Sequence, residues 1–193
     1  MTLSLRQRQR DALRQEIQQV ALRLFAERGF DAVTTDAIAA EVGISASTFF
    51  RHVPNKEQLL IGFAEREGAR VVANFRARPA DEDPAASLRA AILARTSQLA
   101  DDNETLELWR RAMASSPATL RRATLLGRDD AEELLRLVAA RLGGPAASVE
   151  LRAGVLVRAT LAAAEYAYEW WLVHEPRTSL HRLTERALDV VAP

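Results

Sequence analysis

Apolar residues recur every three or four positions through most of the chain, and no segment alternates steadily between apolar and polar residues. This spacing is typical of helices that bury one face. The first stripe predicts a helix over residues 11–28, ended by Gly29. Few prolines and glycines, with many Ala, Leu, Arg and Glu residues, also favour helix over strand. The pattern predicts an all-α protein.

Residues 34–43 predict a short helix followed by a tight turn. Thr34 or Thr35 can cap its start, and Ile38, Ala39 and Val42 recur at helical spacing on one buried face. Gly43 follows directly, at a position where a left-handed residue commonly ends a helix.

A second short helix is predicted over residues 46–52, with Ser45 as its cap and Phe49 as its single inward-pointing anchor. A two-turn helix with an otherwise polar surface is not stable alone. We therefore expect the preceding helix to hold this second helix in place, so that its polar side can face a binding partner. Two helices in this relation form a helix-turn-helix, whose second helix enters the DNA major groove.

The rest of the chain predicts a helical body. A long helix over residues 56–78 should join it to the head, and the PADEDP segment at 79–84 should end that helix. Further helices are expected at 84–99, around 106–113, 117–142 with Gly127 as a weak point, 148–173 and 179–191. We therefore expect a three-helix DNA-binding head at 1–55 and a separate helical body at 56–193.

Charge is balanced overall but unevenly placed. Lys and Arg number 26, as do Asp and Glu, yet Arg6, Arg8, Arg10 and Arg14 crowd the start of the chain. Residues at a chain terminus are commonly disordered. We interpret residues 1–10 as a disordered arm that becomes partly ordered along DNA.

Lys56 is the only lysine in the chain and is predicted to open the 56–78 helix, after Asn55 as its cap. A cation at a helix start opposes the helix dipole by about 0.3–1 kcal/mol. A nearby DNA phosphate would explain it, although a solvated lysine is the plainer alternative.

These segments resemble the TetR family of bacterial transcriptional regulators. The matching residues are Thr34-Thr35, Ile38-Ala39, Gly43-Ile44-Ser45, Thr48-Phe49-Phe50, His52, Asn55-Lys56-Glu57 and Leu59-Leu60. Two departures stand out. Phe50 occupies a position where the family usually has Tyr, so one hydroxyl contact to a phosphate is in doubt, and Val53 replaces a common Phe.

The resemblance implies a sequence-specific DNA-binding regulator, usually a repressor that a small molecule releases from a palindromic operator. The residues that would face DNA by this resemblance are Thr35, Ser45, Ala46, Ser47, Thr48, Phe50, His52 and Lys56. Arg51 and the arginines of the arm would add local positive charge.

The 148–173 helix carries apolar and small residues round most of its surface, which predicts burial on two sides. One stripe is Gly154, Val157, Leu161, Ala164 and Tyr168, and the other is Val155, Ala159, Ala162, Tyr166 and Trp170. One side can serve the subunit core and the other a partner subunit. By resemblance, the last two helices would pair with those of a second subunit. Our candidate interface residues are Val157, Leu161, Ala164, Tyr168, Leu183 and Ala187.

Large apolar side chains in the body are candidates for an effector pocket, namely Trp109, Met113, Tyr166 and Trp170. Such residues are more often core, which is the competing interpretation. As a pocket they would suit an apolar or aromatic effector. The C-terminal half also resembles the mycofactocin-regulator branch of the family, which implies a fatty acyl thioester.

Composition narrows the function further. Cysteine is absent, so disulfides, thiolate chemistry and most structural zinc sites are excluded, and no metal or cofactor is expected. No signal sequence and no stretch of eighteen apolar residues is visible, so we expect a cytoplasmic protein.

Two other classes of function compete. A small helical enzyme could draw on His174, His181, Glu169 and Glu175, but no nucleophile, base and orienting group occur together. A helical interaction module without DNA binding is the other alternative, and Phe50 is the feature that invites it.

Overall fold

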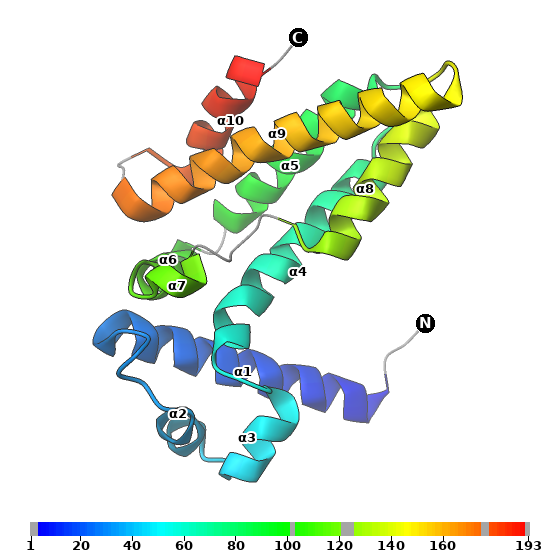
Figure 1. The fold of residues 1–193 in the computed structure, drawn as a ribbon. Coiled ribbons are helices and arrows are strands. Elements are labelled where there is room, and N and C mark those ends of the chain that lie inside the picture. Colours follow the sequence, from blue (N-terminus) through cyan, green and yellow to red (C-terminus); the bar gives the residue numbers. More distant parts are fainter. Residues whose placement is uncertain (1–3, 101–102, 121–125, 175–177, 192–193) are drawn as a thin grey trace. The chain divides into compact units, whose positions relative to one another are not determined.

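A computed structural model describes residues 4–100, 103–120, 126–174 and 178–191, which are helical and contain no strand (Figure 1). The helices are α1 (Leu5–Arg28), α2 (Thr35–Val42), α3 (Ala46–His52), α4 (Glu57–Arg76), α5 (Pro84–Ala100), α6 (Asn103–Ala114), α7 (Pro117–Leu120), α8 (Arg128–Arg141), α9 (Ala146–His174) and α10 (Leu180–Val191). The predicted all-α class is confirmed.

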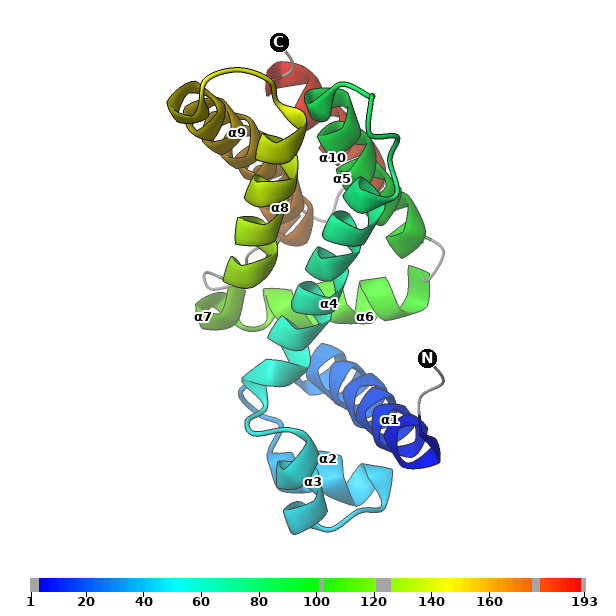
Figure 2. The same cartoon turned by 90° about the vertical axis from the view of Figure 1, so that its right-hand side faces the viewer.

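The chain divides into two compact units. The first contains residues 1–63 and 104–123, and the second contains residues 64–103 and 124–193. Residues 104–123, placed with the body by the sequence pattern, thus group with the helix-turn-helix. Within the first unit, α2 and α3 lie beside α1 (Figure 2).

Helix α1 is longer than its apolar stripe predicts. It starts at Leu5 rather than near Asp11, because the Ser4 hydroxyl accepts a hydrogen bond from the Gln7 N–H at 3.2 Å and caps the first turn. The expectation of a disordered arm is therefore wrong for residues 5–10, and residues 1–3 lie outside the described part of the chain. Arg6, Arg8 and Arg10 are held on a helix.

The first unit is built on apolar side chains from α1, α2, α3, α4 and α6, together with Phe30 of the α1–α2 loop. Its fully or nearly fully buried residues include Ile17, Leu24, Phe25, Phe30, Ile38, Phe49, Leu60, Trp109 and Met113. The Phe25 and Phe30 rings meet at 4.9 Å between centroids. Three hydrogen bonds tie the α6 segment to the head: Trp109 Nε1 donates to Leu60 O, Arg111 donates to Ala26 O, and Ser115 Oγ accepts from the Phe30 N–H.

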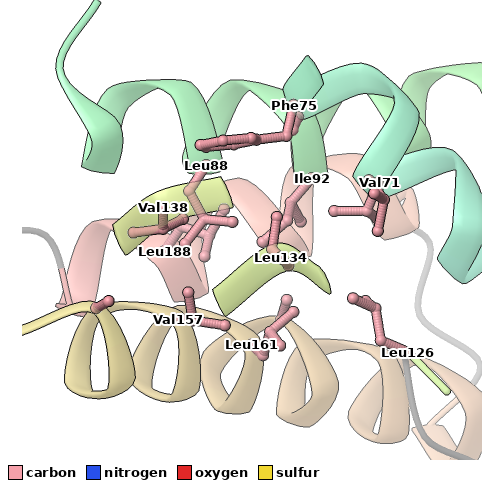
Figure 3. Packing of buried hydrophobic residues seen from close by; sticks show 14 residues of the cluster. Val71, Phe75, Leu88, Ile92, Leu126, Leu134, Val138, Val157, Leu161 and Leu188 are labelled. Atoms are coloured by element: carbon pink, nitrogen blue, oxygen red, sulfur yellow. The ribbon is translucent and has the colours of Figure 1, made fainter. Parts of the chain in front are cut away.

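The second unit has a separate core. Side chains from α4, α5, α8, α9 and α10 converge there, among them Phe75, Ile92, Leu134, Val157 and Leu188 (Figure 3). Both ribbon views show α10 alongside α5 and α9 (Figures 1 and 2). Arg89 of α5 also pairs with Asp189 of α10 at 2.7 Å.

The predicted 117–142 helix is two helices. Helix α7 ends at Leu120 and α8 begins at Arg128, while residues 121–125 lie outside the described chain. Gly127, the predicted weak point, lies in the break that precedes α8. It is the extended residue before α8, with φ −62° and ψ 161°, and its carbonyl accepts the Ala131 N–H.

Arg141 closes the C-terminal end of α4. Its guanidinium donates to the carbonyls of Phe75, Arg78 and Pro79 and to Ser87 Oγ, at 3.1–3.2 Å, and lies 4.3 Å from the Phe75 ring centroid. The last carbonyls of a helix lack partners within the helix. One side chain therefore satisfies a helix end and joins α4, α5 and α8.

We expect Arg141→Met to lower the free energy of unfolding by about 2–3 kcal/mol, because charge-assisted hydrogen bonds to several carbonyls are lost together. Urea denaturation measures this change. Arg136→Met is the matched control on the same helix, since the Arg136 side chain is 72% exposed and only meets Glu133. Its cost should stay below about 1 kcal/mol. Equal costs would contradict the proposed role of Arg141.

Candidate nucleic-acid interface

The turn between α2 and α3 is set by local hydrogen bonds. Thr34 Oγ1 accepts the Ala37 N–H at 3.1 Å, so Thr34 is the cap of α2. Gly43 adopts the left-handed conformation at φ 77°, where a side chain would be strained. The Ile44 N–H then reaches Ala39 O at 2.9 Å and ends α2.

Ser45 caps α3 and also restrains its reading side. Its hydroxyl accepts the Thr48 N–H at 3.2 Å and lies 3.0 Å from Thr48 Oγ1. Both hydroxyls are thereby partly engaged with each other. Ser47 precedes Thr48 on α3 and is exposed. Its hydroxyl is therefore more available than that of Thr48.

Phe49 is the anchor of α3. Its side chain is fully buried, and its ring meets that of Phe50 edge-on at 5.5 Å. Phe50 itself is 50% exposed, so an apolar ring stands among the polar residues of α3. Ser45, Ala46 and Arg51 are exposed as well, while the remaining predicted contacts Thr35, Thr48 and His52 are half-buried.

Lys56 does not point away from the protein. Its Nζ donates to Phe30 O at 2.9 Å and to Val33 O at 3.2 Å, and lies 4.3 Å from the Phe30 ring centroid. Asn55 Oδ1 accepts the Gln58 N–H at 3.0 Å and caps α4, so Lys56 lies at the start of this helix, as predicted. The oddity that suggested a phosphate partner is explained within the protein, where the ammonium serves two carbonyls of the α1–α2 loop.

The arginines of α1 do not share one face. Arg6 and Arg10 are four residues apart and lie on the side of α1 that meets Arg51 and His52 of α3. Arg8 is two residues from each, so it points elsewhere and is exposed. Arg14, counted among the arginines near the start of the chain but not among the predicted DNA contacts, also acts on His52 through its charge.

The four candidate pocket residues lie in different environments. Trp109 and Met113 are buried in the first unit, and the Trp109 N–H is taken by Leu60 O. Tyr166 and Trp170 belong to the second unit and are 67% and 37% exposed. The core interpretation therefore fits Trp109 and Met113, whereas Tyr166 and Trp170 line an open face of α9.

The structure reverses our assignment of the two α9 stripes. Val157, Leu161, Ala164 and Tyr168 are at most 8% exposed and belong to the interior of their own subunit, where burial raises the pKa of Tyr168. They are therefore unsuited to a subunit interface. The exposed residues, which we call the outer stripe, are Leu151, Val155, Ala159, Ala162, Tyr166 and Trp170. On α10, Leu183 and Ala187 are half-buried.

The histidines of the second unit do not form a catalytic set. His174 stacks on Trp170 of its own helix at 4.5 Å between ring centroids, and His181 Nδ1 lies 2.9 Å from Thr96 Oγ1. Glu175 lies outside the described residues. Within the described residues, no group of three His, Cys, Asp or Glu side chains is placed to hold a metal. Nor does any described helix have the length and apolarity of a membrane span.

Comparison with known proteins identifies both parts of the chain. Residues 17–62 match the family model of bacterial regulatory proteins of the tetR family, and residues 82–193 match that of the MftR C-terminal domain. MftR of Mycobacterium tuberculosis, described as a mycofactocin biosynthesis transcriptional regulator, is 30% identical over 95% of this chain and 91% of its own. The chain belongs to the TetR family.

Other TetR-family proteins agree with this result. TcmR of Streptomyces glaucescens, an HTH-type transcriptional regulator, is 30% identical over 72% of this chain, which spans 64% of TcmR. The crystal structure of Thermus thermophilus FadR, a repressor in complex with lauroyl-CoA, covers 92% of both chains with a TM-score of 0.54 and 22% identity. Because the relatives are transcriptional regulators, the comparisons place this TetR-family chain among regulators and not among enzymes.

We expect Lys56→Met to lower the free energy of unfolding by about 1–3 kcal/mol without any DNA present, since two carbonyls lose a charged donor. Urea denaturation of the isolated protein measures this effect. Arg51→Met removes an exposed charge nearby and should stay within about 0.5 kcal/mol. An unchanged stability in Lys56→Met would return Lys56 to the list of candidate phosphate contacts.

Proposed function

We propose that this protein is a homodimeric transcriptional repressor. It binds a palindromic operator through α3 and releases it when an apolar or aromatic ligand binds the C-terminal helices. The observation that carries the proposal is the arrangement of α3: Phe49 and the Ser45 cap hold a seven-residue helix whose exposed residues are small, polar or basic. A helix of this kind suits the major groove.

Ser47 and Phe50 are the side chains best placed to read sequence. The Ser47 hydroxyl can donate to or accept from either base of a pair. Phe50 has no hydroxyl for a phosphate, but its exposed ring can pack on the methyl group of thymine. The departure from the family pattern would then replace a backbone contact by a base contact.

The outer stripe supports pairing of two copies. Leu151, Val155 and Tyr166 are each at least 60% exposed, which is costly for a helix facing water alone. Val190 of α10 is 84% exposed and extends the half-buried Leu183 and Ala187 along one face. Two-fold pairing of these helices would bury the stripe and present two copies of α3, about 34–36 Å apart, to successive major-groove faces.

The ligand class is supported by the match of residues 82–193 to the MftR C-terminal domain and by the lauroyl-CoA bound to the FadR repressor. A fatty acyl thioester is therefore the first effector to test. Since such regulators commonly act beside their own gene, the adjacent promoter is the first DNA to test.

In fluorescence-anisotropy titrations at fixed salt, we expect the protein to bind this promoter DNA at least about a thousandfold more tightly than random DNA. Ser47→Glu should weaken binding to both DNAs, because a carboxylate repels the phosphates around the groove. Lauroyl-CoA added to the complex should lower the anisotropy. Equal affinity for both DNAs would favour the alternative of an interaction module.

We expect Tyr166→Glu to give a folded monomer, because it places a charge within the proposed interface while leaving the subunit core intact. Light scattering coupled to size exclusion gives the mass, and circular dichroism gives the helix content. Leu161→Glu is the contrasting variant: it buries a charge in the core and should lose helix content as well. A dimeric Tyr166→Glu protein would contradict this interface.

A further inference from the structure

The first unit has a hollow on its surface between α1 and α3. Four residues of α1 and two of α3 line it, namely Arg6, Gln9, Arg10, Leu13, Arg51 and His52. Arg6, Gln9, Arg10 and Leu13 follow each other at helical spacing, so one face of α1 forms one wall. Arg51 and His52 are the last two residues of α3 and form the other.

The hollow concentrates positive charge without a counter-charge. None of its six lining residues is acidic, and three are arginines. It also lies near the start of α1, where unpaired backbone N–H groups add a partial positive charge and no acidic residue occupies the first turn. A site with this charge attracts an anion and costs the unliganded protein some stability.

The positive charge around the hollow also affects the pKa of His52. Desolvation and the charges of Arg51, Arg10 and Arg14 all lower the pKa of His52 below its usual value. Helix α2 also packs against α3 and carries two carboxylates. Glu41 is bonded to Arg23 at 2.6 Å, and Asp36 lies in the first turn of α2. Near neutral pH, the imidazole of the free protein is therefore mostly uncharged.

We propose that the α1–α3 hollow is a preformed seat for one phosphate of the operator backbone, and that seating this phosphate drives uptake of a proton by His52. The proposal rests on the DNA-binding function proposed above. It adds a defined phosphate site, and a pH dependence, to that function.

The chemistry of the lining fits a phosphodiester. Arginine presents paired N–H donors that match two oxygens of one phosphate, and here guanidinium groups approach from two helices. Because Arg6 and Arg10 are already on a helix, their backbone does not have to be ordered on binding. A disordered arm carrying the same residues would lose more entropy and hold no fixed site.

The sign of the pH effect follows from the charges. A seated phosphate offsets the repulsion by Arg51, Arg10 and Arg14, so the pKa of His52 rises in the complex. The complex then binds more protons than the free protein, and operator affinity increases as pH falls between these two pKa values. Uptake of one proton per subunit gives up to about a tenfold change per pH unit for each site.

The test measures promoter binding by anisotropy from about pH 5.5 to 8 at fixed ionic strength, a range that covers histidine titration. Affinity of the wild-type protein should fall as pH rises, and His52→Gln should flatten this dependence. His52 is the only histidine outside the second unit, so no other imidazole of the first unit competes for the assignment.

Arg10→Gln and Arg8→Gln form the matched pair, because each removes one arginine from the same helix and glutamine is a comparable helix former. We expect Arg10→Gln to lower affinity about fivefold to tenfold and to reduce the slope of log affinity against log salt by about 1. Arg8→Gln should lose less affinity and keep the pH dependence. Circular dichroism checks that both remain helical.

The outcomes separate the two proposals. If wild-type protein does not prefer the promoter over random DNA, the proposed function fails and the phosphate seat with it. If the promoter is preferred but Arg10→Gln equals Arg8→Gln, or the pH dependence survives in His52→Gln, the seat alone is overturned.

Discussion

Burial of Phe49 is the constraint on which the DNA-binding unit depends. Helix α3 has seven residues, too few to be stable in water, so its conformation is supplied by the core into which Phe49 inserts. Every element of the first unit contributes to that core or fastens it. Helices α1 and α2 provide its walls, and the bonds of Lys56 and Ser115 fix the loop containing Phe30. The exposed face of α3 can therefore be polar, because the buried core of the first unit stabilises the helix.

Helix α9 shows how one element serves two environments. The residues on one side, such as Val157 and Leu161, complete the core of the second unit, whereas the outer stripe is apolar yet exposed. A single subunit has no use for an exposed apolar stripe. The subunit core is independent of that surface, so changes to assembly and changes to stability can be separated by position along the same helix.

Local rules predicted the helix-turn-helix well. The residues Thr34, Gly43 and Ser45 act within three to five positions of themselves, so their roles as caps and turn residue could be predicted from the sequence and are confirmed. The start of α1 was missed because its first turns carry no apolar stripe, and only the Ser4 cap marks it. The sequence pattern marked Gly127 as a weak point but still predicted one helix over residues 117–142, whereas α8 begins only after Gly127.

Contacts between residues that are far apart in the sequence could not be predicted from local patterns. Both stripes of α9 are apolar, and hydropathy alone does not tell which meets the subunit core. The partners of Lys56 lie 23 and 26 residues away in sequence, so its inward position depends on how the head folds. The hollow between α1 and α3 likewise combines residues about forty positions apart, and appears only once the two helices are packed.

The inward-turned ammonium of Lys56 has a practical consequence. No other side chain in the protein carries a primary amine, and this one is half-buried and bonded to two carbonyls. An acylating reagent can modify it readily only when the loop that carries Phe30 opens. The rate of lysine labelling, read by mass spectrometry, is therefore a built-in gauge of how often the helix-turn-helix unit opens, with no engineered probe required.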